Sequence, residues 1–340
     1  MENILFKRSS FFLSLNVPGR PVKFVYRLDN QQKIKSRFIA YTSRIKLLNS
    51  YELISIDDDT IKKILVSRKI SSRKGDNGIV LVVGGNRIYH GAPILASIAA
   101  LRSGTDLVYT AIPSINVEAT RSYSPDLIVL PLVDEKLTIG SASRLIKSLP
   151  KKVNSAAIGM GMSIAKKEAL LSLIETLLKN KTKLVLDASA LIPEILSKIK
   201  GTDCIITPHG GEYMRLFKTE LNDQDINNNA HIEHVVKNAN KYGITIILKG
   251  WKNIISNGAR AAVIERSTPA MTVGGTGDVL AGLAAGFFSK MNSFDAACTS
   301  VYFNGLAGIL AYQKVGLHMA ASDLLDNLPY VIKKFDQIDN

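Results

Sequence analysis

Short apolar runs that end in glycine or polar residues recur along this chain, and this pattern constrains its fold most. The run at residues 79–85, IVLVVGG, is rich in β-branched residues and bounded by glycines, which is typical of a buried parallel strand. A helical pattern follows over residues 89–104, with Pro93 near its start and Gly104 just past its end. Strands that alternate with helices predict an α/β fold, in which helices flank a doubly wound, mainly parallel sheet.

The same alternation continues toward the C-terminus without internal repeats or a low-complexity linker. Residues 51–340 are therefore expected to form one domain. A short helix is expected at TIKKIL, because the acidic residues 57–59 precede it. Further strands are expected at residues 106–112, 126–130, 155–159, 184–186, 204–206 and 245–248, an edge strand at 261–264, and helices at 166–179 and 231–242.

The formal net charge of +14 is concentrated at the N-terminal end of the chain. Residues 1–74 hold 16 Lys and Arg against 6 Asp and Glu, whereas the remaining residues hold 27 against 23. This distribution, without any RNP, KH or helix-turn-helix signal, argues against a nucleic-acid partner. Residues 1–50 are expected to be a basic, disordered N-terminal extension, with an organelle transit peptide as the alternative.

The cysteine content and the apolar runs bear on the compartment. Cys204 and Cys298 lie far apart and form no metal or redox pattern, which favours a reduced, intracellular setting. No apolar run has the length needed to span a bilayer. We therefore expect a cytoplasmic protein without a membrane partner.

Polar and glycine-rich clusters follow the predicted strands. In doubly wound sheets, ligands bind in the crevice beyond the carboxyl ends of the strands. The clusters therefore mark one candidate site along that edge. They are Gly84 with Gly85, residues 159–163, Asp187, residues 207–212, residues 249–253 and residues 274–278.

The last of these clusters, GGTGD, is the most informative for chemistry. Gly274, Gly275 and Gly277 surround Thr276 and lead through Asp278 into an apolar helical run. Unpaired amides at such a helix N-terminus bind phosphate, and the glycines let the backbone approach it. A carboxylate at a phosphate site is unfavourable unless it accepts a proton from an attacking hydroxyl, so Asp278 is the candidate general base. The alternative is that Asp278 only caps the helix.

The other clusters each have a functional and a structural interpretation. His209 could hydrogen-bond a substrate and Glu212 could organise a hydrated Mg²⁺ near phosphates, or both could simply cap a helix. Lys249 could place an ammonium against a nucleotide, or it could be an ordinary lysine at a strand end. Gly161 permits close approach of a ligand or only a tight turn, and Ala92 could begin a helix. Neither a Walker A motif nor a G-x-G-x-x-G fingerprint is present.

Taken together, these motifs resemble one family, the ADP/ATP-dependent NAD(P)H-hydrate dehydratases of the ribokinase-like superfamily. The resemblance covers about residues 55–335. It rests on KGDNGIVLVVGG, GAPILASIAALRSGTDLV, AIGMG, LDASAL, TPHGGEYMRL, ILKG, GGTGDVLAGLAAGF and MAASDLL, which occur in the family's order.

The resemblance implies a repair reaction on hydrated NADH or NADPH (NADHX, NADPHX). A phosphoryl group from ADP, or from ATP, is transferred to the ring hydroxyl, and phosphate then leaves. The resemblance further implies Mg²⁺ as cofactor and a homotetramer. It assigns substrate contacts to Ala92, Gly161, His209 and Asp278, and nucleotide contacts to Lys249, Gly250, Trp251, Lys252, Asn253 and Gly277. The chemistry of the residues adds nucleotide contacts by Gly274, Gly275 and Thr276 and an indirect metal contact by Glu212.

Two departures and two alternatives accompany this resemblance. Many relatives have G-P-G-L-G where this chain has residues 159–163, GMGMS, so the last glycine is replaced by Ser163. Residues 1–50 are too few for the epimerase domain that often precedes the dehydratase, so none is expected. The alternative functions are a small-molecule kinase of the same superfamily, of the hydroxyethylthiazole or sugar type, and a nucleic-acid-binding protein that uses the basic N-terminus.

Overall fold

The computed structural model describes residues 11–17, 20–26, 51–221, 230–265 and 268–339. The chain divides into two units, Met1–Ser50 and Tyr51–Asn340. In the first unit, the described residues form an antiparallel hairpin of β1 (Phe11–Val17) and β2 (Arg20–Tyr26). Apart from this hairpin, the residues expected to be disordered within 1–50 lie outside the described ranges.

The second unit is built on a ten-stranded sheet with the order β3-β13-β12-β11-β10-β9-β8-β5-β6-β7. Strands β5 to β11 pair in parallel, β12 runs antiparallel to both of its neighbours, and β13 pairs in parallel with β3. The doubly wound, mainly parallel sheet that the sequence predicts is confirmed. The strands are β3 (Glu52–Ile54), β5 (Ile79–Val83), β6 (Leu107–Pro113), β7 (Ile128–Leu132), β8 (Ser155–Ile158), β9 (Lys183–Leu186), β10 (Cys204–Ile206), β11 (Thr245–Leu248), β12 (Lys252–Ser256) and β13 (Arg260–Glu265).

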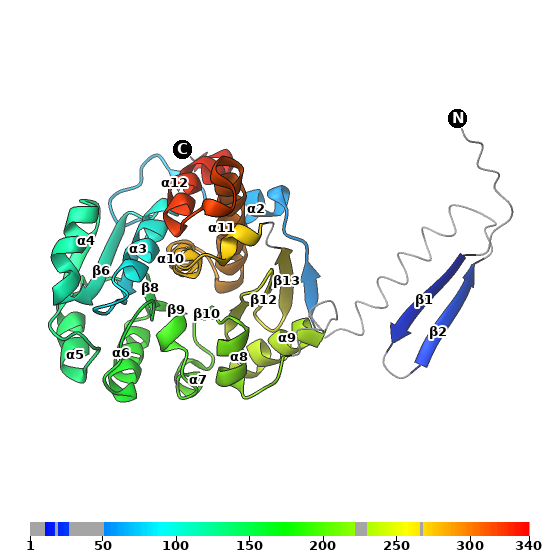
Figure 1. The fold of residues 1–340 in the computed structure, drawn as a ribbon, viewed down its shortest axis with the longest axis horizontal. Coiled ribbons are helices and arrows are strands. Elements are labelled where there is room, and N and C mark those ends of the chain that lie inside the picture. The colour runs from blue at the N-terminus through cyan, green and yellow to red at the C-terminus, as the bar shows by residue number, and fades with distance from the viewer. Residues whose placement is uncertain (1–10, 18–19, 27–50, 222–229, 266–267, 340) are drawn as a thin grey trace. The chain divides into compact units, whose positions relative to one another are not determined.

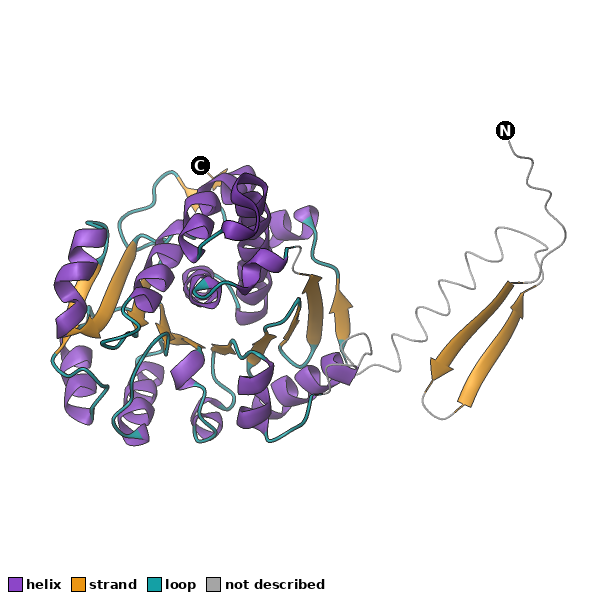
Figure 2. Cartoon of the chain, in the orientation of Figure 1, coloured by secondary structure: helices purple, strands orange, loops and turns teal. Residues whose placement is uncertain are grey.

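Helices cover both faces of this sheet (Figures 1 and 2). One face carries α2 (Asp58–Ile64), α3 (Gly91–Arg102), α10 (Thr276–Phe288), α11 (Ser293–Val315) and α12 (Ala321–Ile332). The other face carries α5 (Ile139–Ser148), α6 (Lys167–Lys179), α7 (Ile195–Ile199), α8 (Gly210–Phe217) and α9 (Ala230–Tyr242). The short α4 (Val117–Tyr123) precedes β7, and β4 (Arg68–Lys69) pairs with β14 (Ile338–Asp339) in a separate ladder.

The period of two along each strand divides the core into two layers. In β5, Val80 and Val82 belong to the cluster under α3 and α10, whereas Leu81 and Val83 belong to the cluster over α5 and α6. All four side chains are fully buried. A strand buried on both faces must be apolar at every position, which explains the continuous run in the sequence.

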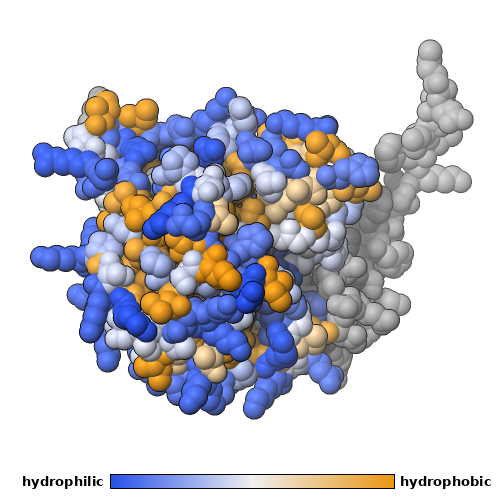
Figure 3. Space-filling model, turned by 60° about the vertical axis from the view of Figure 1, so that its left-hand side comes forward, coloured by the Kyte–Doolittle hydropathy of each residue, from blue (hydrophilic) through white to orange (hydrophobic). Residues whose placement is uncertain are grey.

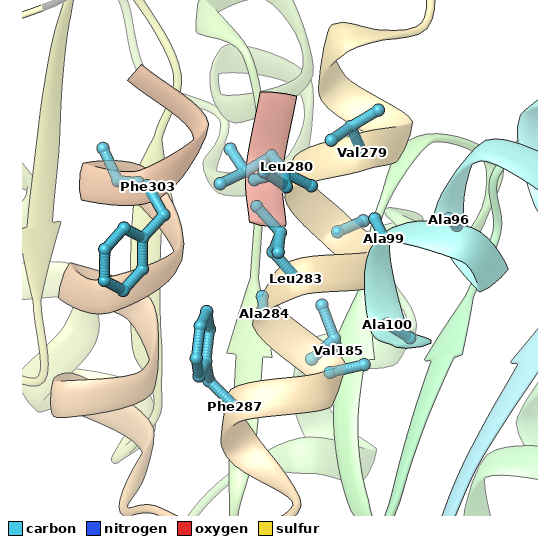
Figure 4. Close-up of a cluster of buried hydrophobic side chains, with 14 of the residues drawn as sticks. Ala96, Ala99, Ala100, Val185, Val279, Leu280, Leu283, Ala284, Phe287 and Phe303 are labelled. Carbon is cyan, nitrogen blue, oxygen red and sulfur yellow. The ribbon is translucent and has the colours of Figure 1, made fainter. Parts of the chain in front are cut away.

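Helix α10 lies at the centre of its layer, between α3 and α11 (Figure 4). Ala96, Ala99 and Ala100 of α3 face it with small side chains, so the two helix backbones approach closely. A Cβ added at Gly282 of α10 would lie 2.0 Å from the carbonyl oxygen of Ala96. This close packing of α10 against α3 sets where the GGTGD turn, at the start of α10, can lie.

Replacing Gly282 with alanine is expected to destabilise the fold, because the new methyl group would meet backbone rather than a movable side chain. Overpacking of this kind costs about 1–3 kcal/mol or more, which exceeds the helix-propensity gain of about 1 kcal/mol. Thermal unfolding should show a lower Tm for Gly282→Ala. The matched control is Gly305→Ala in α11, where a Cβ would meet no heavy atom within 4 Å and Tm should not fall.

The structure corrects the sequence prediction at one edge of the sheet. Residues 261–264 were expected to be an edge strand, but β13 lies inside the sheet because β3 pairs with it. Residues 249–253 were expected as one polar cluster after a strand, and residues 252 and 253 instead begin β12. At the opposite edge of the sheet, Pro131 lies within β7, and an edge strand is where proline is tolerated.

The surface shown in Figure 3 has hydrophobic residues in small groups among hydrophilic ones. The more exposed large apolar side chains include Ile88, Tyr89, Ile70 and Leu317. Among the residues that the structure describes, no helix combines the length and apolar character needed to cross a membrane.

Candidate active site

The carboxyl ends of three neighbouring strands place polar residues side by side. Asp187 follows β9, Thr207 follows β10 and Lys249 follows β11. The N–H of Lys249 donates a 2.8 Å hydrogen bond to the carbonyl of Pro208, and a parallel bridge joins Lys249 to His209. The predicted row of polar clusters at one edge of the sheet is therefore present, and it includes His209 and Lys249.

The ammonium group of Lys249 lies between carboxylates from two other elements. Its Nζ is 2.7 Å from Oδ1 of Asp187 and 3.9 Å from Oε2 of Glu212. Asp187 is 2% exposed and also accepts a 2.7 Å hydrogen bond from the hydroxyl of Thr207. Because both members of the ion pair are shielded from water, the pair fixes the position of the ammonium.

The charge on Lys249 is maintained by these neighbours. Burial alone lowers the pKa of Lys249, but Asp187, Glu212 and Asp278 outweigh it and hold that pKa above its ordinary value. A Cβ added at Gly277 would lie 3.5 Å from Nζ of Lys249. A fixed positive charge thus lies beside the first turn of α10, where unpaired amides already favour an anion.

The GGTGD turn is shaped by glycine and by packing from distant segments. Gly275 has φ +97°, and a Cβ there would lie 2.7 Å from Cβ of Ala321 and 2.8 Å from Cδ1 of Leu95. The MAASDLL stretch and α3 therefore pack directly against the turn. A Cβ at Gly274 would meet no heavy atom within 4 Å, so this part of the turn is open to a ligand. The hydroxyl of Thr276 donates a 3.0 Å hydrogen bond to a preceding backbone carbonyl, which holds the turn in shape.

Asp278 occupies the first turn of α10 and is partly buried. Burial and the negative charge of Asp187 raise the pKa of Asp278 to about 7, against a smaller lowering by Lys249. A carboxylate with that pKa is a competent general base at neutral pH, because about half of it is deprotonated and that form is basic enough to accept a proton.

His209 and Glu212 form a capping box at the start of α8. Glu212 Oε2 accepts a 2.8 Å hydrogen bond from the N–H of His209, and His209 Nδ1 accepts one of 3.1 Å from the N–H of Gly211. Since Nδ1 accepts, the proton of the neutral ring lies on Nε2. The His209 side chain is 58% exposed, so both the capping role and a substrate contact are open to it.

The donor set offers no dedicated metal cage. No group of three or more His, Cys, Asp or Glu with metal-binding geometry occurs among the described residues. The carboxylate of Glu212 is already engaged by the N–H of His209 and lies near Lys249. Such a site suits a Mg²⁺ ion that keeps its waters and is carried by nucleotide phosphates, so indirect contact by Glu212 stays a prediction.

Ala92 and Gly161, both predicted to contact the substrate, lie side by side. A Cβ added at Gly161, which has φ +61°, would lie 2.7 Å from the carbonyl oxygen of Tyr89 and 3.1 Å from Cβ of Ala92. The adjoining loop is fixed by Asn86, whose amide donates a 3.0 Å hydrogen bond to the hydroxyl of Ser163. The serine that replaces the last glycine of the family pattern therefore anchors this loop.

A pocket opens between the GGTGD turn and α11. Four residues predicted to contact the nucleotide line it: Lys249, Asn253, Thr276 and Gly277. The remaining lining residues, which sequence reasoning missed, are Ile264, Glu265, Met271, Leu280, Val301, Asn304 and Gly305.

The other predicted contact residues lie outside this pocket's lining. Trp251 is 47% exposed, and Lys252 lies over its ring at 4.5 Å while pairing with Glu265 at 2.8 Å. Asp187 was recognised only as a polar residue at a strand end, and its signal was the LDASAL motif itself. Which residues touch a ligand stays a prediction for all of them.

Comparison with known proteins places this geometry in a family. A family model described as NAD(P)H-hydrate dehydratase matches residues 80–330. The ADP-dependent (S)-NAD(P)H-hydrate dehydratase of Nitrosopumilus maritimus is 54% identical over 279 residues, which cover 82% of this chain and 96% of that protein. The enzyme of the same name from Cenarchaeum symbiosum is 50% identical over 285 residues, which cover 84% of this chain and 98% of that protein.

A solved structure shares the fold at lower sequence identity. The ADP/ATP-dependent NAD(P)H-hydrate dehydratase of Bacillus subtilis, co-crystallised with ATP/Mg²⁺, is 23% identical and superposes with a TM-score of 0.70. The match covers 82% of this chain and 98% of that one. On the strength of the family model and the two archaeal relatives, the chain belongs to the NAD(P)H-hydrate dehydratase family.

Proposed function

We propose that the protein restores NADH and NADPH from their hydrated forms in an ADP-dependent dehydration that releases AMP and phosphate. The observation that carries this proposal is Asp278, a carboxylate with a pKa of about 7 at an open phosphate-type turn beside the fixed ammonium of Lys249. The names of the two archaeal relatives support the same reaction.

In the first step, the ring hydroxyl of the hydrate attacks the terminal phosphorus of ADP. Asp278 accepts the hydroxyl proton, a bond forms between that oxygen and phosphorus, and the bond from phosphorus to the AMP oxygen breaks. The Gly274–Gly277 backbone and Lys249 stabilise the charge on the moving phosphoryl group.

In the second step, the carbon–oxygen bond breaks and phosphate leaves with the electron pair. The neighbouring ring carbon loses a proton, and the dihydropyridine ring is restored. Phosphate is a far better leaving group than hydroxide, which explains why a dehydration consumes a nucleotide. Mg²⁺, carried on the nucleotide phosphates, would supply further charge neutralisation.

The nucleotide and the hydrate are proposed to lie on opposite sides of the GGTGD turn. The pocket beside Thr276 and Gly277 suits the nucleotide. Ala92 and Gly161 lie together, and α3, which carries Ala92, packs against the turn through Leu95, so both are assigned to the hydrate side. His209 is assigned to the hydrate side, while ATP remains the alternative phosphoryl donor.

The kinase alternative is less supported. The matches to the two archaeal relatives cover nearly the whole length of each relative, and both relatives carry the dehydratase name. The cytoplasmic location and the homotetramer remain predictions that cell fractionation and light scattering can test.

The proposed function is tested by incubating the protein with NADH hydrate and ADP and following the near-ultraviolet absorbance of NADH. Absorbance should rise only when both are present, with one AMP formed per NADH. Stable phosphorylation of a thiazole alcohol or sugar, without recovery of NADH, would instead establish the kinase alternative. Replacing ADP with ATP in the same assay decides the phosphoryl donor.

Replacing His209 with alanine is expected to raise KM for the hydrate a few-fold to tenfold, with little change in KM for ADP. A lost side-chain hydrogen bond is worth about 0.5–1.5 kcal/mol, which corresponds to that change in affinity. Steady-state kinetics with each ligand varied separately measures it.

The variant His209→Asn is the matched control, because asparagine can still cap α8 while it lacks the imidazole. Both variants should raise KM for the hydrate if the ring contacts substrate. If only His209→Ala has a raised KM, and the rise is equal for the hydrate and for ADP, His209 acts in the capping box alone.

A further inference from the structure

Asn304 of α11 is a buried residue whose amide oxygen has no hydrogen-bond partner. Asn304 is 7% exposed, and its Oδ1 makes no hydrogen bond. A buried polar atom left unpaired costs about 1–3 kcal/mol, so natural proteins rarely keep one without a reason. The position of Asn304 supplies a reason, because it lines the pocket next to the GGTGD turn.

Asn304 differs in this respect from the other polar side chains that line the pocket. Those four all have partners within the protein. Lys249 pairs with Asp187, Glu265 pairs with Lys252, Asn253 contacts two backbone groups, and Thr276 donates to a backbone carbonyl. Among the described lining residues, Asn304 is the polar side chain left available to a ligand.

The surroundings of Asn304 are partly apolar and partly charged. Ile264, Met271 and Val301 give the pocket apolar walls. A Cβ added at Gly305 would meet no heavy atom within 4 Å, so the helix surface beside Asn304 is open. The same pocket is bordered by Lys249 and Gly277, where the charge favours phosphate. A planar base attached to a phosphate chain meets both requirements.

We propose that the amide of Asn304 binds the N6/N7 edge of the nucleotide base and makes the site prefer adenine over guanine. This inference rests on the proposed function and adds the residue that selects the base. Asparagine pairs with adenine by accepting from the N6 amino group and donating to N7. Guanine presents acceptors at both O6 and N7, so turning the amide over cannot restore the lost bond.

The direct test is the affinity of the full chain for three nucleotides, measured by calorimetry: ADP, GDP and 7-deaza-ADP, which lacks the N7 acceptor. The wild-type protein should bind ADP about tenfold to hundredfold more tightly than GDP, which is the usual discrimination by a bidentate pair. It should bind 7-deaza-ADP about tenfold more weakly than ADP. This arm needs no variant, so it does not depend on whether a variant folds.

Two variants extend the test. Asn304→Leu keeps the size of the side chain and should bring the three affinities within about threefold of one another, since no bidentate pair remains. Asn304→Asp presents only acceptors, so it can still accept from N6 of adenine but loses the bond to N7, and 7-deaza-ADP should then bind no more weakly than ADP. The matched control is Thr299→Val. Thr299 also lies in α11 and its hydroxyl is buried without a partner, but Thr299 does not line the pocket. It should leave the preference unchanged.

The outcomes separate this inference from the proposed function. If wild type and Asn304→Leu both bind ADP with the same preference over GDP, the base-reading role is wrong and the dehydratase proposal stands. The role would also be wrong if Asn304→Leu weakened binding of ADP but not of 2′-deoxy-ADP, because the amide would then contact the ribose. If the wild-type protein binds none of the nucleotides, the proposed function is wrong, and the base-reading role that rests on it is wrong as well.

Discussion

Asp278→Asn is expected to lower kcat by about 10²–10⁴-fold while leaving the affinity for ADP nearly unchanged. Loss of a general base typically has this effect, because proton transfer in the transition state is removed while ground-state contacts remain. Asparagine fills the same space and keeps the first turn of α10 intact. Single-turnover rates together with calorimetric ADP binding measure the two quantities separately.

The thermal stability of Asp278→Asn shows whether misfolding causes its loss of activity. The pKa of Asp278 is raised from 3.8 to about 7, so its charged form is disfavoured in the folded state. Wild type therefore loses stability as pH rises from about 4 to 7. Asp278→Asn should have a Tm at or above that of wild type at pH 8, and the difference should shrink as pH falls through 7. If Asp278→Asn has both a lower Tm and a lower activity than wild type, its low activity does not support Asp278 as the base.

Asp187→Ala is expected to be the second most damaging change. It leaves the ammonium of Lys249, on a side chain only 18% exposed, without its nearest carboxylate. Removing one partner of a buried pair costs about 3–5 kcal/mol, and the ammonium is free to leave the phosphoryl position. Both Tm and kcat should fall, with kcat reduced by at least tenfold.

Asp187→Asn separates charge from shape. It should move the acidic limb of the pH–rate profile to lower pH, because the charge of Asp187 raises the pKa of Asp278 and the released Lys249 lowers it further. The matched control is Lys167→Ala, which breaks an exposed pair with Glu194 at 2.8 Å and should leave both Tm and the pH–rate profile unchanged. A profile that does not move in Asp187→Asn would show that Asp187 only supports the fold.

The sequence predicts the centre of this fold better than its edge. The run at residues 79–85 and the Ala- and Leu-rich α10 are recognisable because burial on both sides demands apolar residues at every position. β3 has three residues, two of them exposed, so its sequence lacks any periodic signal. β12 begins with Lys252 and Asn253, whose polar side chains mask the apolar pattern of the strand.

The candidate site divides in the same way. Asp278 and Lys249 follow local motifs that carry a physical reason for their position. The ion pair between Asp187 and Lys249 joins residues 62 positions apart, and only the order of the strands brings them together. Asn304 lies in the middle of a long helix among apolar residues. Nothing in the sequence distinguishes it from a core position, so its availability to a ligand emerges only from packing.

The most direct test of Asp278 as the general base is the pH dependence of kcat/KM for the hydrate, measured with ADP below its own KM so that the profile reports the ligand-free enzyme. Wild type should show an acidic limb with an apparent pKa of about 7, below which kcat/KM falls tenfold per pH unit. Asp278→Asn should show a low, flat profile over the same range. A wild-type profile without a limb near 7, or the same limb persisting in Asp278→Asn, would contradict the assignment.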